Sequence, residues 1–249
     1  MYNNVYMKLV LFDVDGTLAP SGKKIEQPMI ECLSLLKTKC DNIELGIVGG
    51  GSYNKICWQL DIAKDMFRYV FSECGAVVHI DGKLTNEKNM LELADRDILN
   101  NIIRTAFIEI ASMPIIYHGC QMDFRKGLIY ISPPGIQATD YERNIFAKAD
   151  KEFDLRKKLI EKLLSIDNVK DQYEITIGGH VGIAVYPKGW DKSQVIDMIP
   201  NIDNLELYFF GDKTEPEGND YPIYSHPRVK GYSVTDPNNT IEIIEKLWL

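Results

Sequence analysis

Short apolar segments alternate with amphipathic segments along much of the chain. The apolar ones are rich in Val, Leu, Ile, Phe and Tyr, and we expect them to form buried strands at residues 8–14, 43–48, 69–72, 205–210 and 230–234. Segments with helical spacing of apolar residues follow them at residues 26–39, 53–60, 192–199 and 239–247. This alternation predicts a mainly parallel sheet with helices on both faces, an α/β fold.

The middle of the chain has a different pattern. Residues 89–111 have the spacing of a long helix, and residues 151–165 form a second, charged helical segment. Alternating or apolar runs joined by short links lie around these helices: PIIYHG, MDFRKGLIYISP, YEITIGG and VGIAVYP. Such runs predict an antiparallel sheet carrying helices, an α+β layer. We therefore expect a domain at residues 87–186 that is inserted into an α/β domain made of residues 1–86 and 187–249.

The composition is that of an ordinary globular protein, with 45% hydrophobic and 26% charged residues. A net charge of −8 argues against a nucleic-acid partner, because binding to the phosphate backbone depends on clustered Lys and Arg. Five cysteines occur without a C-x-x-C pair, which is typical of reduced thiols in a cytoplasmic protein. The apolar runs are shorter than the roughly 20 residues of a membrane span. No signal-peptide pattern opens the chain, so we expect a cytoplasmic protein without a membrane partner.

Two aspartates end the first apolar segment, in the stretch LVLFDVDGTLAP. Side chains two positions apart point to the same side of a strand, so Asp13 and Asp15 are expected to face one spot. Two neighbouring carboxylates repel unless a cation lies between them, and the turn at Gly16-Thr17 brings backbone N–H groups close. The pattern predicts a metal site, with room for an anion, at the carboxyl end of a strand, where open α/β sheets bind ligands.

These residue types suit phosphoryl transfer. An ionised Asp13 can attack phosphorus to form an aspartyl-phosphate. Asp15 is the candidate general acid for the leaving oxygen and general base for the incoming one. Mg²⁺ is the expected metal because it prefers oxygen ligands. The alternative is a chance D-x-D in a surface turn, which an apolar strand running directly into D-x-D-G-T disfavours.

DVDGTL resembles the first motif of the haloacid dehalogenase superfamily, whose phosphotransferases use an aspartate nucleophile. Over nearly its full length the chain resembles the eukaryotic phosphomannomutases, in the segments FDVDGTLAP, GIVGGGSYNKI, FRKGLIYISPPG, YPKGWDK and YFFGDKTEPEGNDYPIY. The resemblance implies a Rossmann-like core with an α+β cap. It also implies Mg²⁺-dependent interconversion of hexose 1-phosphate and hexose 6-phosphate for GDP-mannose supply, a hexose bisphosphate activator, and a homodimer formed through the cap.

The later segments supply further candidate site residues. By resemblance, Lys192 is a catalytic residue that steadies the nucleophile and the phosphoryl group, and Asn219 orients a ligand or a metal-bound water. The expected metal ligands are Asp13, Asp15, Asp212 and Asp220. Without the resemblance, Lys192 is a solvated charge at the start of a helix, and the later aspartates are turn residues.

Substrate-binding residues are expected in both domains. The turn after the second strand offers backbone N–H groups and a hydroxyl to phosphate oxygens, and its residues are Gly50, Gly51 and Ser52. In the cap, Arg125 and Arg143 match arginines that hold the phosphate remote from the metal, which suits the bidentate guanidinium group. A surface ion pair is the alternative for each. Gly179 and His180 complete the expected set.

Several ligand positions of the family carry different residues here, namely Gly22, Gly51, Ile136, Gly182 and Ala184. A lost charged contact to phosphate or sugar costs roughly 1.5–3 kcal/mol, so the sugar-recognising half of the site is altered. His118, His180 and Lys126 are candidate replacements, although a single histidine more often has a structural role.

Three functions therefore stay open. The first is a hexose-phosphate mutase with altered sugar recognition, which we expect. The second is a Mg²⁺-dependent sugar-phosphate phosphatase on the same scaffold, in which water intercepts the aspartyl-phosphate. The third is a non-catalytic binding protein, and the intact set Asp13, Asp15, Lys192 and Asp212 argues against it.

Overall fold

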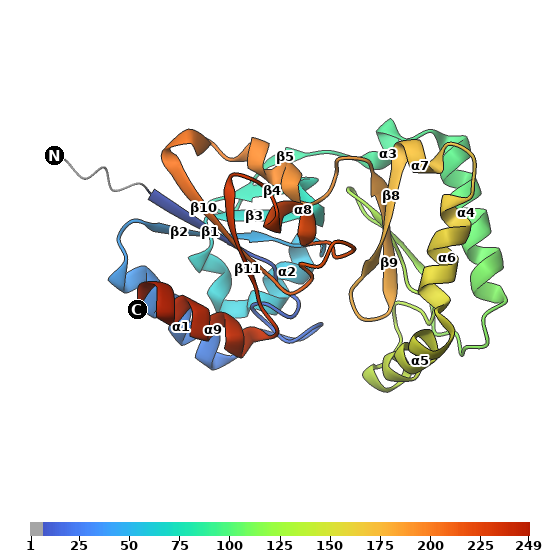
Figure 1. Ribbon diagram of the computed structural model, residues 1–249, viewed down its shortest axis with the longest axis horizontal. Helices are drawn as coiled ribbons and strands as arrows, with labels where there is room; N and C mark the ends of the chain where they lie inside the picture. The colour runs from blue at the N-terminus through green and yellow to red at the C-terminus, as the bar shows by residue number, and fades with distance from the viewer. Residues whose placement is uncertain (1–6) are drawn as a thin grey trace. The chain divides into compact units, whose positions relative to one another are not determined.

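A computed structural model describes residues 7–249, and the chain divides into two compact units (Figure 1). The core comprises Met1–Glu87 and Trp190–Leu249, and the cap comprises Lys88–Gly189. The first boundary thus falls one residue after the expected position and the second falls three residues after it. The turn at Asp81 and Gly82 joins two strands of the core.

Across the described residues, the core contains a seven-stranded sheet in the order β11-β10-β1-β2-β3-β4-β5. The parallel strands are β1 (Met7–Phe12), β2 (Ile43–Val48), β3 (Tyr69–Ser72), β10 (Leu205–Gly211) and β11 (Val229–Ser233). An antiparallel hairpin of β4 (Val77–Ile80) and β5 (Lys83–Glu87) extends the sheet at one edge. The predicted strands are all present, and the hairpin is an addition that the apolar pattern did not indicate.

Helical segments cover both faces of the core sheet, which explains why its strands are continuous apolar runs. Val10 and Phe12 pack on one face and Leu9 and Leu11 on the other, and all four are fully buried. The first face is covered by α1 (Gln27–Lys39), α2 (Tyr53–Leu60) and α9 (Pro237–Trp248), and the second by the 3-10 helix η3 (Lys192–Met198) and α8 (Tyr221–Tyr224). Further 3-10 helices are η1 (Asp61–Met66), η2 (Glu73–Gly75) and η4 (Ile202–Asn204).

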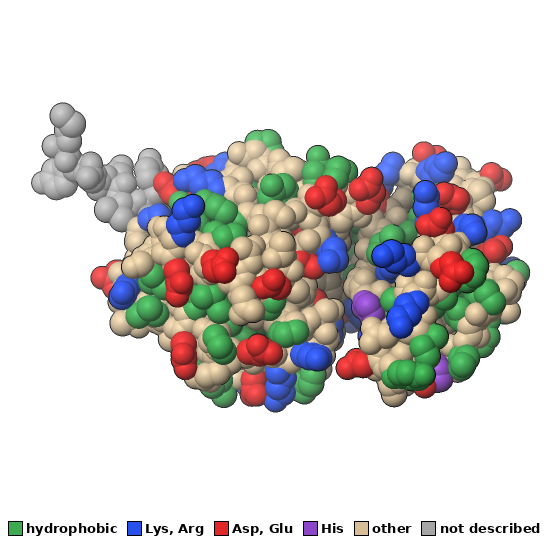
Figure 2. Space-filling view, turned by 60° about the horizontal axis from the view of Figure 1, so that its bottom comes forward, with side chains coloured by type: hydrophobic (Ala, Val, Ile, Leu, Met, Phe, Trp, Pro, Cys, Tyr) green, Lys and Arg blue, Asp and Glu red, His purple; other side chains and the backbone are tan. Residues whose placement is uncertain are grey.

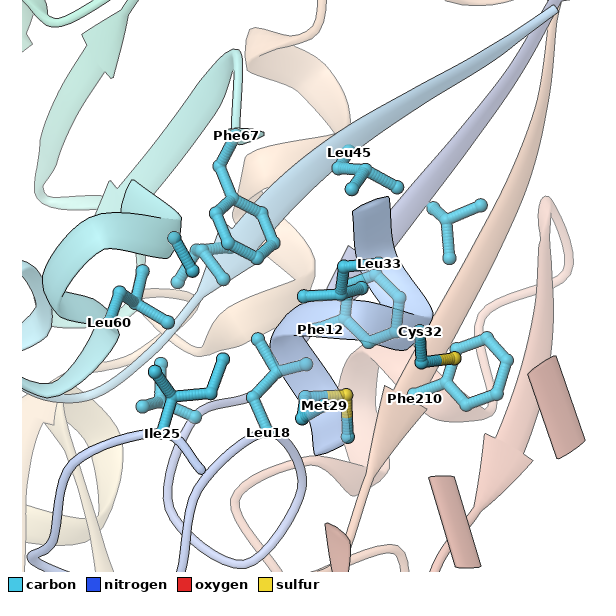
Figure 3. Packing of buried hydrophobic residues seen from close by; sticks show 14 of the residues in the cluster. Phe12, Leu18, Ile25, Met29, Cys32, Leu33, Leu45, Leu60, Phe67 and Phe210 are labelled. Carbon is cyan, nitrogen blue, oxygen red and sulfur yellow. The ribbon is translucent and has the colours of Figure 1, made fainter. Parts of the chain in front are cut away.

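Aromatic packing fixes the centre of the first face (Figure 3). The ring of Phe12 stacks on Phe210 with centroids 5.1 Å apart, and it meets the ring of Phe67 edge-on at 6.4 Å. Phe12 and Phe210 are Cα partners across β1 and β10. This contact joins β1 and β10, each of which is followed directly by an aspartate described below.

The cap contains a four-stranded antiparallel sheet in the order β6-β7-β9-β8, with helices gathered on one side of it (Figure 1). Its strands are β6 (Met122–Phe124), β7 (Ile129–Ile131), β8 (Tyr173–Gly178) and β9 (Gly182–Pro187). Its helices are α3 (Met90–Leu93), α4 (Arg96–Ala111), α5 (Asp140–Phe153), α6 (Leu155–Leu164) and α7 (Val169–Gln172). The row of neighbours Asp123, Tyr130, Ala184 and Thr176 is only half-buried, and we call the sheet face that carries it the open face.

Some predicted elements of the cap are wrong in detail. The run PIIYHG at residues 114–119 forms no strand, because Tyr117 donates hydrogen bonds to the carbonyls of Ile110 and Met113 and ties the segment to the end of α4. The long helical pattern at 89–111 is two helices, since Asp95 caps a new start at α4. The charged segment at 151–165 belongs to α5 and α6, which are separated at Asp154 by a left-handed backbone conformation.

The described part of the chain contains no helix that is long and apolar enough to cross a membrane. Acidic and basic side chains are interspersed over the face displayed in Figure 2. The cysteines Cys32, Cys40, Cys57, Cys74 and Cys120 are free thiols, and Cys120 is exposed.

Candidate active site

Three aspartates meet at the carboxyl edge of the core sheet. Asp13 directly follows β1, Asp212 directly follows β10, and Asp220 directly precedes α8. One carboxylate oxygen of each lies within 4.8 Å of the others. Because β1 and β10 are parallel neighbours in the sheet, their ends bring Asp13 and Asp212 together, and the N–H of Asp13 still donates to the carbonyl of Phe210 at 2.9 Å.

Two glycines make room for this cluster. Gly16 has a φ of +87°, and a Cβ there would lie 2.6 Å from Oδ2 of Asp212. A Cβ on Gly211 would lie 2.6 Å from Oδ2 of Asp220. The two carboxylates therefore pack directly against glycine backbone, and a side chain at either position would displace one of them.

Lys192 provides the buried positive charge of the site. Its Nζ donates to Oδ1 of Asp13 and to Oδ1 of Asp220, both at 2.5 Å, and the residue is fully buried. Burial alone would lower the pKa of Lys192, but the carboxylates of Asp13 and Asp220 outweigh it and raise that pKa above its ordinary value. The lysine is therefore an ammonium ion with two carboxylate partners.

Asp13 itself is disfavoured as an anion in this environment. Burial raises the pKa of Asp13 to about 7; Lys192 opposes the shift, and the nearby Asp220 and Asp212 add to it. Three carboxylates against one buried ammonium leave excess negative charge in a confined space. A divalent cation would remove this excess.

The donor set fits Mg²⁺. All three ligands are carboxylate oxygens, which a small hard cation prefers, and phosphoryl oxygens and water suit the remaining positions. On the solvent side, Nζ of Lys213 contacts Oδ2 of Asp212 at 2.5 Å, and its side chain is 57% exposed. The sequence pattern did not indicate a role for Lys213, which directly follows the expected ligand.

Asp15 lies outside this cluster, although it was expected among the metal ligands. Its Oδ1 accepts hydrogen bonds from the N–H of Gly22 at 2.6 Å and from Nε2 of Gln59 at 2.8 Å, and its Oδ2 accepts from Nζ of Lys55 at 2.8 Å. The strand alternation that predicted a shared spot ends with β1 at Phe12. Asp15 is therefore held by α2 and the loop after β1 rather than by the three aspartates.

The partners of Asp15 set its ionisation. Burial would raise its pKa, but the charge of Lys55 and the hydrogen bonds from Gly22, Lys55 and Gln59 outweigh burial and hold the pKa below its ordinary value. The side chain is thus arranged as an ionised proton acceptor. Lys55 and Gln59 were not predicted as site residues, but their i, i+4 spacing on α2 places them on one helix face.

The glycine-rich turn before α2 is held from two sides. The carbonyl of Gly51 accepts from the N–H of Glu73 at 3.0 Å, and the carbonyl of Gly49 accepts from the N–H of Cys74 at 3.0 Å. Oγ of Ser52 accepts from the N–H of Lys55, so this hydroxyl acts as the N-cap of α2. Gly50, in the middle of the turn, is half-buried. The turn leads directly into a helix N-terminus, an arrangement that favours anions.

The two cap arginines have different surroundings. Nε of Arg125 donates to Oδ2 of Asp123 at 2.6 Å, and its guanidinium lies over the ring of Tyr130 on the open face. Arg143 donates from Nε to the carbonyl of Ala138 and from Nη2 to the carbonyl of Ile136, each at 2.9 Å. Arg143 therefore stabilises the loop before α5, whereas the side chain of Arg125 lies against the open face of the sheet.

The other expected ligand residues of the cap are spread over its loops. Nδ1 of His118 pairs with Glu142 at 3.1 Å, and Nε2 of His180 lies 3.1 Å from Oδ1 of Asn144. The carbonyl of Gly179 accepts from Arg156 at 3.4 Å, and the carbonyl of Lys126 accepts from Met90 at 2.7 Å. The structural role of Arg156, which also binds Asp150 and Gly182, was not indicated by the sequence. In the core, Asn219 is half-buried and precedes Asp220.

The chain matches known proteins over nearly its full length. The sequence profile described as eukaryotic phosphomannomutase matches residues 29–249. A phosphomannomutase of Triticum aestivum is 36% identical over 248 residues, which cover 97% of this chain and 95% of the relative. Phosphomannomutase 1 of Homo sapiens is 33% identical over 238 residues, which cover 94% of this chain and 89% of the relative.

Solved structures share the fold at low sequence identity. The C-terminal domain of C. albicans trehalose-6-phosphate phosphatase has a TM-score of 0.64 and 16% identity, covering 98% of this chain and 94% of that one. A haloacid dehalogenase-like hydrolase from Bacteroides thetaiotaomicron has a TM-score of 0.57 and 15% identity, covering 96% and 99%. These neighbours confirm the predicted core-and-cap architecture, and the sequence matches confirm the predicted resemblance: the chain belongs to the eukaryotic phosphomannomutase family.

Proposed function

We propose that the protein is a Mg²⁺-dependent phosphotransferase that interconverts hexose 1-phosphate and hexose 6-phosphate, with mannose phosphates as the first substrates to test. One observation carries the proposal: Asp13, Asp212, Asp220 and the buried Lys192 form a compact charged site at the carboxyl edge of the core sheet. The chain that carries this site aligns with phosphomannomutases over nearly its full length.

Asp13 is the proposed nucleophile. Its carboxylate forms a bond to phosphorus while the bond between phosphorus and a sugar oxygen breaks, which gives an aspartyl-phosphate and a sugar hydroxyl. Lys192 holds Oδ1 of Asp13 and so fixes the orientation of the attacking group. Mg²⁺ held by Asp13, Asp212 and Asp220 would neutralise these carboxylates and the phosphoryl oxygens.

Asp15 is the proposed proton carrier. When a sugar hydroxyl attacks the aspartyl-phosphate, Asp15 takes its proton, and when a sugar oxygen leaves phosphorus, Asp15 returns one. The low pKa that its partners impose suits the acceptor step. This favours a cycle that starts from phosphorylated Asp13, for which a hexose bisphosphate is the proposed phosphoryl donor.

Gly50, Gly51, Ser52 and Asn219 in the core, and Arg125, Arg143, Gly179 and His180 in the cap, are the proposed substrate contacts. Arg143 also donates to two backbone carbonyls of the cap. If the cap holds its ligand weakly, water reaches the aspartyl-phosphate and the enzyme releases orthophosphate. A sugar-phosphate phosphatase activity is therefore the second candidate.

We further propose a cytoplasmic homodimer formed through the cap. The exposed apolar side chains Phe107 and Ile108 of α4 support a protein contact on this unit. Sedimentation of the wild type and of a variant with both residues replaced by Ser would measure the assembly.

The proposed function is tested with mannose 1-phosphate and glucose 1-phosphate, Mg²⁺ and glucose 1,6-bisphosphate, scoring both the 6-phosphate and orthophosphate. The wild type is expected to form the 6-phosphate faster than orthophosphate, and Asp13→Asn is expected to form neither. Acid quenching and mass spectrometry should find the phosphoryl group on Asp13. Turnover that persists in Asp13→Asn would exclude the proposed nucleophile, and absence of turnover in the wild type would exclude the activity.

A further inference from the structure

Tyr130 lies in the middle of the open face of the cap sheet. Its Cα partners are Asp123 on β6 and Ala184 on β9. Its hydroxyl donates to the carbonyl of Gly178 at the end of β8, at 3.3 Å. The aromatic side chain therefore extends across the neighbouring strand toward the β8–β9 turn.

The ring of Tyr130 occupies the space above Gly182. A Cβ on residue 182 would lie 2.3 Å from Cζ, 2.4 Å from Oη and 2.5 Å from Cε2 of this ring. Gly182 is not among the glycines with positive φ, so its backbone conformation does not by itself require glycine. A side chain at position 182 would therefore have to displace the ring of Tyr130, and the two residues form a matched pair.

The same ring supports Arg125. The guanidinium carbon of Arg125 lies 5.0 Å from the ring centroid of Tyr130, and Nε is held by Asp123. The arginine side chain is 18% exposed. A guanidinium held against an aromatic face and a carboxylate loses less rotational freedom when it binds an oxyanion.

We propose that Tyr130 is a positioning residue that orients Arg125 for the phosphoryl group that does not react, and that Gly182 is required because it makes room for the ring. The inference rests on the proposed function for the identity of the ligand, a phosphorylated hexose. It assigns recognition of this end of the ligand to a stacked Tyr–Arg pair, because neither Gly182 nor Ala184 carries a hydrogen-bonding side chain.

The first test measures binding of glucose 1,6-bisphosphate by calorimetry without Mg²⁺, so that no turnover is needed. Tyr130→Phe keeps the ring and is expected to bind within twofold of the wild type. Tyr130→Ala is expected to weaken binding by roughly fivefold or more, as for the loss of a partly buried cation–π contact. In an Arg125→Met background, Tyr130→Ala is expected to cause no further loss, because it acts through the arginine.

The second test uses the matched pair. Gly182→Ala is expected to weaken binding in the wild type, because the new methyl group displaces the ring, and to have no effect in Tyr130→Ala. Gly178→Ala is the control, since its Cβ would make only ordinary contacts at 3.6 Å. Urea unfolding of each variant separates lost binding from lost folding.

The outcomes separate this inference from the proposed function. Additive losses from Tyr130→Ala and Arg125→Met, or weak binding by Tyr130→Phe, would overturn the positioning role even if Asp13-dependent turnover is present. A wild type that fails to bind the bisphosphate would overturn the role as well.

Discussion

Nζ of Lys192 lies 2.5 Å from Oδ1 of Asp13 and 2.5 Å from Oδ1 of Asp220. Lys192 opens η3, whereas Asp13 directly follows β1 and Asp220 directly precedes α8. A single buried ammonium thus joins three parts of the core, and its removal would leave three carboxylates without a buried counter-charge.

Lys192→Met is therefore expected to lower the free energy of unfolding by roughly 3–5 kcal/mol at neutral pH without Mg²⁺, the range for breaking a buried ion pair. Urea denaturation measures this change. Lys213→Met is the matched control, since this lysine pairs with Asp212 from solvent and its loss should cost less than about 1 kcal/mol. Equal losses in the two variants would show that Lys192 is not the buried counter-charge.

Mg²⁺ alone is expected to stabilise the protein. Binding to the folded state adds about 2.7 kcal/mol when the free ion is at 100 times its dissociation constant. Thermal unfolding with increasing Mg²⁺ measures this, and chelation should reverse it. Asp212→Asn should lose most of the response, whereas Asp203→Asn, whose side chain is 85% exposed and pairs with Arg228, should keep it. A full response in Asp212→Asn would place the ion elsewhere.

Gly16→Ala is expected to destabilise the protein more than Gly22→Ala. Both residues have positive φ, at +87° and +72°, so both substitutions carry backbone strain of roughly 1–2 kcal/mol. Only at Gly16 would the new Cβ also meet a carboxylate, that of Asp212, while nothing lies within 4 Å of a Cβ at Gly22. Chemical denaturation of both variants compares their losses in free energy of unfolding. Similar losses would show that the side chain of Asp212 can move away from the new Cβ at little cost.

His79 should give the core a pH-dependent stability. Its ring stacks on Tyr53 at 3.5 Å, and burial lowers its pKa below the ordinary value. The unfolded chain therefore takes up this proton at higher pH than the folded chain does. The neutral side chain of His79 therefore stabilises the folded protein in full above the pKa of histidine in the unfolded chain, roughly 6.5. This stabilisation is lost as the pH falls below that value.

His79→Phe keeps a ring over Tyr53 and removes the titration. Its free energy of unfolding is expected to depend less on pH between pH 5 and pH 7.5 than that of the wild type, as followed by urea denaturation at each pH. An identical slope in His79→Phe would contradict the prediction.

The parallel strands of the core were predictable because a strand that is buried on both faces has a continuous apolar sequence. β5 was missed because its sequence, KLTNE, has no apolar periodicity and all its residues are exposed. The run PIIYHG was wrongly predicted as a strand, because local composition does not reveal that Tyr117 hydrogen-bonds back to α4. Residues 192–199 were predicted as a helix and form the tighter 3-10 type at Lys192–Met198, which is common in short segments.

The candidate site was predictable where chemistry follows directly from a strand end, as at Asp13 and Asp212. It was not predictable where the chain turns back on itself. The contacts of Asp15 with Lys55 and Gln59 depend on how α2 packs beside the loop after β1. The pairing of Tyr130 with Gly182 depends on strand register, which the spacing of residues along one chain does not provide.

The order in which the ribosome releases the chain has a consequence for this sheet. β1 lies between β2 and β10, and Met7 of β1 pairs with Leu205 of β10. Leu205 is synthesised only after the whole cap, Lys88–Gly189, has left the ribosome. The inserted unit is continuous in sequence and can complete its own hydrogen bonding first. Until then β1 has one edge unpaired, so nascent chains stalled before residue 205 should be the form that chaperones bind.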